Sequence, residues 1–208
     1  MAYRWNRRIA LAIALALASP RTAAAQEPGE LQLVVIPSEC TPYLVVPGGA
    51  RTPMYWNQLL SFAACIQDAS IAQIETGADL RAALEELESR LIPSLELYVK
   101  AADGGPGDVQ LRAAYQVAMT YVALMVRARA SIAQVPRLRT RLESELEPVK
   151  RAALAVFELV DRVAGEDPAI ARDPVTAYMV RSARQVAYLL KKDLERSRPD
   201  LQILHAAR

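Results

Sequence analysis

Apolar residues recur at helical spacing over most of the chain, beginning near residue 52. Between residues 80 and 98 they follow one another at intervals of three and four, which places them on one face of a helix. The same period, interrupted by Gly77, residues 103–107, Pro136 and Gly165, predicts further helices. Five helices are expected in all, over residues 52–74, 79–102, 108–133, 137–164 and 173–198.

The third and fifth of these segments differ in how they distribute their apolar residues. Residues 113–126 are apolar nearly all round, with Gln116 and Thr120 as the conspicuous polar exceptions, which predicts a central, buried helix. The fifth segment has one apolar face, made by Val175, Tyr178, Met179, Ser182, Val186, Leu189 and Leu190. The expected fold class is therefore all-α, a bundle of about five helices.

Pro93 and Pro148 lie inside the second and fourth segments. Each proline deletes one backbone hydrogen bond and should kink or divide its helix. The sequence of residues 80–84, LRAAL, resembles that of residues 138–142, LRTRL. A duplicated hairpin, giving two helical hairpins plus one helix, and chance similarity between two Leu/Glu/Arg-rich helices are both compatible with this resemblance.

Residues 26–52 have a different composition from the helical part. They contain two β-like runs, 31–36 and 43–46, separated by frequent proline and glycine, so a long helix cannot persist there. We expect an extended arm, or a small hairpin, that lies on the helical body. The predicted organisation is arm 26–52, bundle 53–198 and C-terminal tail 199–208.

The first 25 residues have the three parts of a cleavable secretory signal. Three arginines precede ten apolar residues, 9–18, and the segment ends in Ala23, Ala24 and Ala25. A membrane anchor is the alternative, but a spanning helix needs about 20 apolar residues. We therefore expect cleavage after Ala25, a mature chain that begins at Gln26, and a periplasmic or secreted location in a bacterium.

Removal of this segment changes the charge balance. The full chain has 25 basic and 23 acidic residues, and the segment carries four of the arginines and no acid. The mature chain therefore has 21 basic and 23 acidic residues, a net charge of −2. This near-neutral balance gives no reason to expect nucleic-acid binding, and no span of the mature chain is apolar enough to predict a transmembrane segment.

Two cysteines, Cys40 and Cys65, predict one disulfide that joins the arm to the first helix, because exported chains fold in an oxidising compartment. Two unpaired buried thiols are the alternative. With His205 as the single histidine, the chain lacks the ligands for a di-iron, zinc or c-type haem site. No metal or cofactor is expected.

The sequence offers little for catalysis. It contains no nucleophile elbow of the G-x-S-x-G type and no phosphate-binding loop. Two groups of carboxylates could hydrolyse glycans if they faced each other, Glu85, Glu86 and Glu88 with Glu143, Glu145 and Glu147. They lie opposite the leucine stripes at ion-pair spacing from arginines, so a solvated face is the simpler interpretation. We expect no enzyme.

Arginines are concentrated around the connection between the third and fourth helices. Six of them and no acid lie between Asp108 and Glu143. Such a cluster could contact an envelope protein, an anionic lipid or a cell-wall polymer, or it could be a charged loop that keeps the protein soluble. The candidate binding residues of this arginine corner are Arg127, Arg129, Arg137, Arg139 and Arg141.

These observations favour an exported, non-catalytic helical binding or adaptor module of the bacterial envelope. A carrier or sensor that holds a small apolar ligand between the proline-containing helices is the first alternative. A carboxylate-dependent hydrolase is the second.

Overall fold

The computed structural model describes residues 37–44, 51–72, 80–132, 139–167 and 169–196. These residues form five α-helices and two short 3-10 helices. The elements are η1 (Ser38–Tyr43), α2 (Pro53–Ala72), α3 (Leu80–Gly104), α4 (Gly107–Ile132), α5 (Arg139–Glu166), η3 (Ile170–Arg172) and α6 (Pro174–Arg196). The predicted all-helical class and the number of long helices are confirmed.

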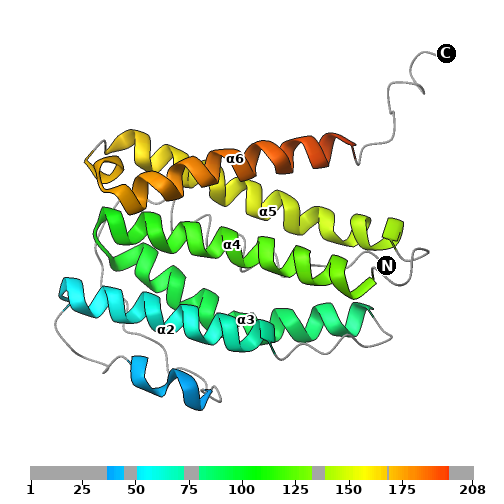
Figure 1. The fold of residues 1–208 in the computed structure, drawn as a ribbon, viewed down its shortest axis with the longest axis horizontal. Coiled ribbons are helices and arrows are strands. Elements are labelled where there is room, and N and C mark those ends of the chain that lie inside the picture. Colours follow the sequence, from blue (N-terminus) through cyan, green and yellow to red (C-terminus); the bar gives the residue numbers. More distant parts are fainter. Residues whose placement is uncertain (1–36, 45–50, 73–79, 133–138, 168, 197–208) are drawn as a thin grey trace.

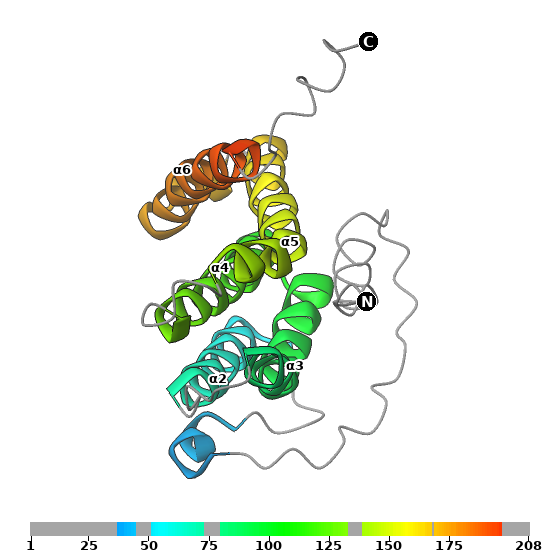
Figure 2. The same ribbon diagram turned by 90° about the vertical axis from the view of Figure 1, so that its right-hand side faces the viewer.

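The five long helices are arranged in two layers. Consecutive helices run antiparallel, so that α2 and α3 form one hairpin, α4 and α5 form a second, and α6 packs on the second (Figure 1). Viewed from the side, α2, α4 and α6 make one layer, and α3 and α5 make the other (Figure 2). The layer of α2, α4 and α6 therefore presents one face of the molecule to solvent, which we call the front face.

Local signals in the sequence set the starts of two helices. The Thr52 hydroxyl accepts a hydrogen bond from the Tyr55 amide at 3.2 Å, ahead of the proline that opens α2. The Asp173 carboxylate accepts one from the Thr176 amide at 2.9 Å, ahead of the proline that opens α6. Helix α4 begins at Gly107 rather than after Asp108, which lies in the first turn and there complements the helix dipole.

The α3–α4 connection depends on close backbone packing. The Gly105 amide donates to the Ala101 carbonyl at 2.9 Å and ends α3. A Cβ atom at Gly105 would lie 2.5 Å from Val109 Cγ1 and 2.6 Å from the Ala101 carbonyl oxygen. Glycine is required here because any side chain would force the two helices apart.

Helix α4 lies at the centre of the core, as its apolar composition predicts. It contacts α3 and α5 most extensively and also touches α2 and α6. Tyr121, Leu124 and Val117 of α4 are almost fully buried, as are Phe157 of α5 and Tyr98 of α3. Burial of a large apolar side chain contributes about 1.5–3 kcal/mol, so these residues stabilise the core around α4.

Neither internal proline divides its helix. Helix α3 continues through Pro93 and α5 through Pro148. Figure 1 shows α3 changing direction part-way along its length, as expected where a proline removes one backbone hydrogen bond. Of the two expected outcomes, a kink or a division, the structure excludes division.

The apolar face predicted for the last helix is only partly right: Leu190 is buried, and Met179, Ser182 and Val186 are half-buried. The core side of α6 is made by Thr176, Val180, Ala183, Ala187, Leu190 and Leu194. Of the predicted face, Val175, Tyr178 and Leu189 are 53%, 63% and 55% exposed. Small residues allow α6 to approach the bundle closely, and the larger apolar side chains form a second stripe that faces outward.

Part of the arm is described. Residues 38–43, which follow the first β-like run, form the 3-10 helix η1, and η1 packs on α2. The β-like run 31–36 lies outside the described residues, as do residues 45 and 46 of the second run and the segments 1–25 and 199–208. Within the described part of the chain, no helix is both long enough and apolar enough to cross a membrane.

Candidate functional site

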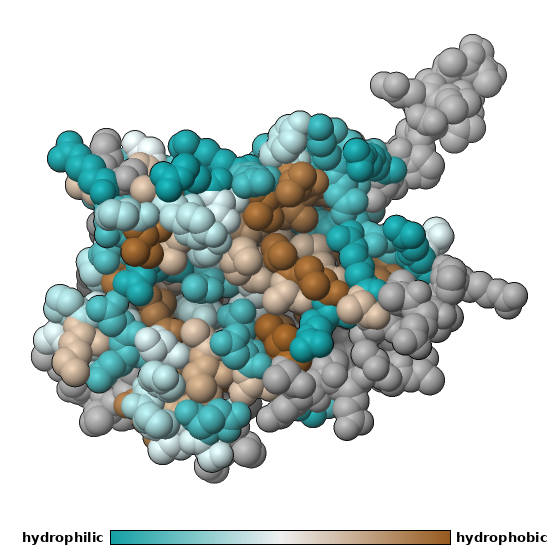
Figure 3. Space-filling model, in the orientation of Figure 1, coloured by the Kyte–Doolittle hydropathy of each residue, from teal (hydrophilic) through white to brown (hydrophobic). Residues whose placement is uncertain are grey.

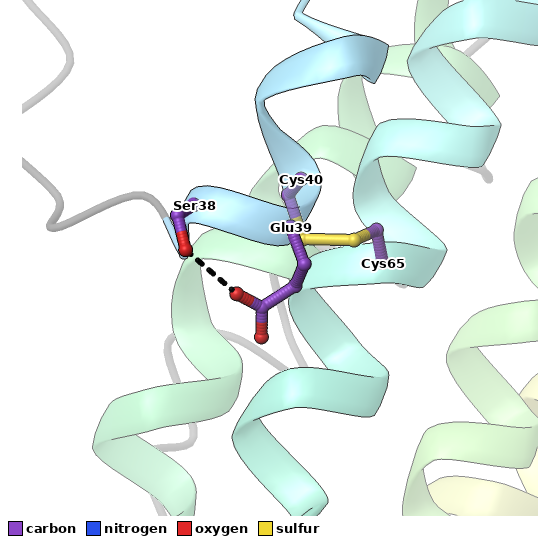
Figure 4. Close-up of a disulfide and its surroundings, with 4 residues drawn as sticks. All are labelled: Ser38, Glu39, Cys40 and Cys65. Carbon is purple, nitrogen blue, oxygen red and sulfur yellow. Dashed lines mark hydrogen bonds between the residues drawn. A yellow bond between two sulfur atoms is a disulfide. The ribbon is translucent and has the colours of Figure 1, made fainter.

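The predicted disulfide joins η1 to α2. The sulfur atoms of Cys40 and Cys65 are bonded, with the two Cα atoms 5.6 Å apart, and Figure 4 shows the bond bridging the two helices. Cys40 is fully buried and is the buried residue of η1. The bond therefore holds a helix of six residues, too short to be stable alone, against the outer side of α2.

An open hollow of about 580 Å³ lies between η1 and α2. Its lining includes Glu39 and Tyr43 from η1, and Ser61, Cys65 and Asp68 from α2. The Glu39 side chain also accepts a hydrogen bond from the Ser38 hydroxyl (Figure 4). This hollow does not lie between the proline-containing parts of α3 and α5, so it is not the apolar site considered from the sequence.

The structure separates the members of the arginine corner. Arg139 and Arg141 are exposed in the first turn of α5, and Arg127 is exposed near the end of α4. Arg137 lies outside the described residues. Arg129 forms ion pairs with carboxylates of two neighbouring helices.

Those ion pairs belong to a network of four residues that joins α4, α5 and α6. Both nitrogens of one edge of the Arg129 guanidinium donate to Glu143, at 2.8 and 2.9 Å, and Nη2 also donates to Asp193 at 2.9 Å. Lys150 Nζ donates to Glu143 Oε2 at 2.7 Å and lies 2.9 Å from Asp193 Oδ2. Two cations therefore balance two anions around Lys150, whose side chain is fully buried.

The network keeps its two carboxylates ionised. Hydrogen bonding from Arg129 is the main cause that lowers the pKa of Glu143, from 4.5 to about 2, with Lys150 acting in the same direction. Burial opposes ionisation of Asp193, but hydrogen bonds from Lys150 and Arg129 outweigh it and lower the pKa of this group too. Neither group holds a proton near neutral pH.

This state bears on the hydrolase alternative. A carboxylate that acts as a general acid must be protonated at the working pH, which requires a raised pKa. Glu143 has a lowered pKa, and Glu147 pairs with Arg151 on its own helix. In addition, no three His, Cys, Asp or Glu side chains of the described ranges gather where a metal ion could bind.

A line of apolar side chains lies where α4 and α6 meet on the front face. Met119, Val122 and Val126 come from α4, and Val186 and Leu189 come from α6; we call this set the α4/α6 seam. Val126 and Leu189 are 58% and 55% exposed, and the other three are half-buried. Figure 3 shows hydrophobic surface on this face, extending from α6 onto α4.

Sequence reasoning missed both the network and the seam. Lys150 lies seven residues after Glu143, close to two helical turns, and that spacing places both on one side of α5. The core side of α6 was marked by Val180, Ala183 and Ala187 at intervals of three and four. The spacing of Glu143 and Lys150 can be read from the sequence, but their partner Asp193 cannot. Helical spacing alone does not distinguish the small residues of α6 from its larger apolar residues as the core side.

No protein-family model matches the chain, and searches of curated proteins and of solved structures find no match either.

Proposed function

We propose that the protein is an exported, non-catalytic helical module that binds another component of the bacterial cell envelope. Export is supported by the signal-like residues 1–25 and by the Cys40–Cys65 disulfide, since disulfides persist in oxidising compartments. The observation that carries the binding role is the α4/α6 seam, where Val126 and Leu189 expose more than half of their surface. Contiguous apolar surface of this kind marks interaction sites.

The non-catalytic role is supported by the state of the described carboxylates. Glu143 and Asp193 are neutralised by Arg129 and Lys150, so their charges hold three helices together. A structural ion network of this kind explains their lowered pKa values without a reaction.

Of the arginine corner, the proposal keeps two residues. Arg139 and Arg141 are exposed and lie at the N-terminus of α5, where positive charge is unfavourable by about 0.3–1 kcal/mol for each residue. An anionic lipid or cell-wall polymer would relieve that repulsion. We assign these two residues to a secondary contact with such a partner, separate from the seam.

Site-specific photo-cross-linking in cells tests the binding role. A photoreactive amino acid at Leu189 should yield adducts with an envelope component, and the cross-linked chain should begin at Gln26. The same amino acid at Ala155, which is exposed on α5 in the other layer, serves as the control and should yield none. Absence of adducts at position 189, or equal adducts at both positions, would contradict the proposed function.

A further inference from the structure

Two polar contacts fix the register of α4 against α6 and bracket the seam. The Tyr115 and Ser182 hydroxyls are 3.0 Å apart, and the Arg129 guanidinium donates to Asp193 at 2.9 Å. Between these contacts α4 presents residues 119, 122 and 126, and α6 presents residues 186 and 189. The intervals of three and four keep both sets on the facing sides of their helices, so the seam is one continuous apolar strip rather than scattered side chains.

The helices that border the seam are basic. Together α4 and α6 contain eight Lys or Arg and three acidic residues. Arg129, Arg184 and Lys191 are paired with carboxylates, but Arg181, Lys192 and Arg196 are exposed on α6, so this pair of helices keeps a positive surface. The other layer, α3 and α5, contains eight Lys or Arg and eleven acidic residues, a net charge of −3. An occupant of the seam therefore meets a positive surround, and complementary charge in a partner is negative.

The same charge distribution argues against a second copy of this chain as the occupant. A two-fold symmetric contact places the same patch of both subunits face to face, which would bring two basic borders together. A flat lipid surface fits poorly as well, because Met119, Val122 and Val186 are half-buried between the helices. Side chains that project from a partner can reach them, as in the packing of one helix against two others.

We propose that the α4/α6 seam is the docking site for an amphipathic helix of another protein, one that carries acidic residues beside its apolar stripe. The apolar stripe, with side chains at positions i, i+3, i+4 and i+7, would pack along Val126 and Leu189 and between the two helices. The acidic residues would face the exposed basic side chains of α6, Arg181, Lys192 and Arg196. This inference rests on the proposed function and names the class of partner that the seam accepts.

Synthetic peptides provide the test. The probe is an amphipathic helical peptide of about 18 residues, with leucines at the four anchor spacings and glutamates beside them. Its controls are the same peptide with lysine for glutamate and a scrambled acidic peptide. The mature protein should bind the acidic probe most tightly, and binding should weaken as salt rises, since exposed charges are screened within about 8–10 Å at physiological ionic strength.

Two pairs of substitutions locate the binding site. Val126→Gln with Leu189→Gln should weaken binding of the acidic probe about tenfold, because two exposed apolar contacts are removed while charge is unchanged and helix propensity is not lowered. Leu44→Gln with Met54→Gln is the matched control. Leu44 follows η1 and Met54 lies in the first turn of α2, both outside the seam. Their side chains are 45% and 68% exposed, and their replacement should leave binding unchanged.

Several outcomes would overturn the inference. The first is that the lysine peptide binds as tightly as the acidic one, and the second is that both pairs of substitutions weaken binding equally. The third is that the protein forms dimers, and the fourth that it binds vesicles, in a way that only the seam variant (Val126→Gln with Leu189→Gln) abolishes. Failure of the proposed function is distinguishable from failure of this inference. If wild-type protein gives the envelope cross-links at position 189 but binds no acidic peptide, the inference alone is wrong.

Discussion

The Lys150 side chain is fully buried, and its Nζ atom lies 2.7 Å from a Glu143 oxygen and 2.9 Å from an Asp193 oxygen. A charge moved out of water is stabilised only when partners and hydrogen bonds replace its hydration. Glu143 and Asp193 do this for Lys150, and they keep contact with water, with 28% and 38% of their side-chain surface exposed. The cation is therefore the member of the network that depends most on its neighbours.

This asymmetry leads to a prediction about two substitutions. Glu143→Gln leaves the buried Lys150 with one anionic partner, and we expect it to lower the free energy of unfolding by about 1–3 kcal/mol. Lys150→Met removes the buried charge, keeps the side-chain volume, and leaves two carboxylates that Arg129 and water can stabilise. We expect it to lower the free energy of unfolding by less than about 1 kcal/mol. Urea unfolding at pH 7 measures both.

The pH dependence provides the control for the same pair of variants. The pKa of Glu143 is about 2 in the folded protein and 4.5 ordinarily, so its ion pairs stabilise the fold fully above pH 4.5. That contribution is lost as the pH falls from about 4.5 toward 2. Glu143→Gln should flatten the fall in stability over this range. An acid-induced fall as steep as that of wild type, or a larger loss in Lys150→Met, would contradict the assignment.

At the scale of elements, η1 depends on its neighbour. It contains six residues, its backbone hydrogen bonds include Cys40 amide to Pro37 carbonyl at 2.9 Å, and its buried side chain is Cys40. So short a helix does not form without tertiary contacts. The disulfide to Cys65 closes a loop of 25 residues, which in the chain-entropy model destabilises the unfolded chain by about 3.5 kcal/mol.

Cys40→Ser should therefore release η1 more than it unfolds the bundle. We expect the amide hydrogens of residues 40 and 44 to exchange much faster with solvent, while those in the middle of α4 exchange at rates that change only with global stability. Reduction of the wild-type bond should reproduce this result. Slow exchange at residues 40 and 44 in the variant would show that packing alone holds η1 on α2.

The elements differ in how well the sequence predicts them. Helix starts at Thr52 and Asp173 depend on local chemistry, a capping oxygen followed by proline, and both were predictable. The disulfide was predictable because only one pairing of two cysteines exists. The core side of α6 was not, because Ala183 and Ala187 are chosen by how closely α6 approaches α4 and α5, which periodicity alone does not reveal.

The site was less predictable than the fold for the same reason. Arg129 has the same local sequence context as Arg127, but α6 places Asp193 against Arg129. That pairing joins residues 64 positions apart, and no local pattern specifies it. Val126 is likewise exposed because no helix of the described residues covers α4 and α6 on the front face, and no local pattern specifies that either.

At the scale of the whole molecule, charge is distributed unevenly. The front helices α4 and α6 are basic, α3 and α5 are acidic, and Arg139 and Arg141 lie at the end of the molecule where α4 finishes (Figure 1). The first turn of α5 contains no acid, so these two arginines add positive charge to the positive end of a helix dipole. Their position is unfavourable for folding, which is consistent with selection for contact with an anion.

Arg139→Gln with Arg141→Gln tests this secondary contact against a matched pair. Arg162→Gln with Arg172→Gln makes the same change of charge at two exposed positions toward the opposite end of α5. Binding of wild-type protein to vesicles that contain phosphatidylglycerol should fall as salt rises, and only the first pair should weaken it at low salt. The first pair should also leave the midpoint of thermal unfolding unchanged or slightly higher, because a charge that opposes the helix dipole is removed. Equal binding by the two pairs would leave Arg139 and Arg141 as solvating charges, while a lower midpoint in the first pair would show that they support the fold.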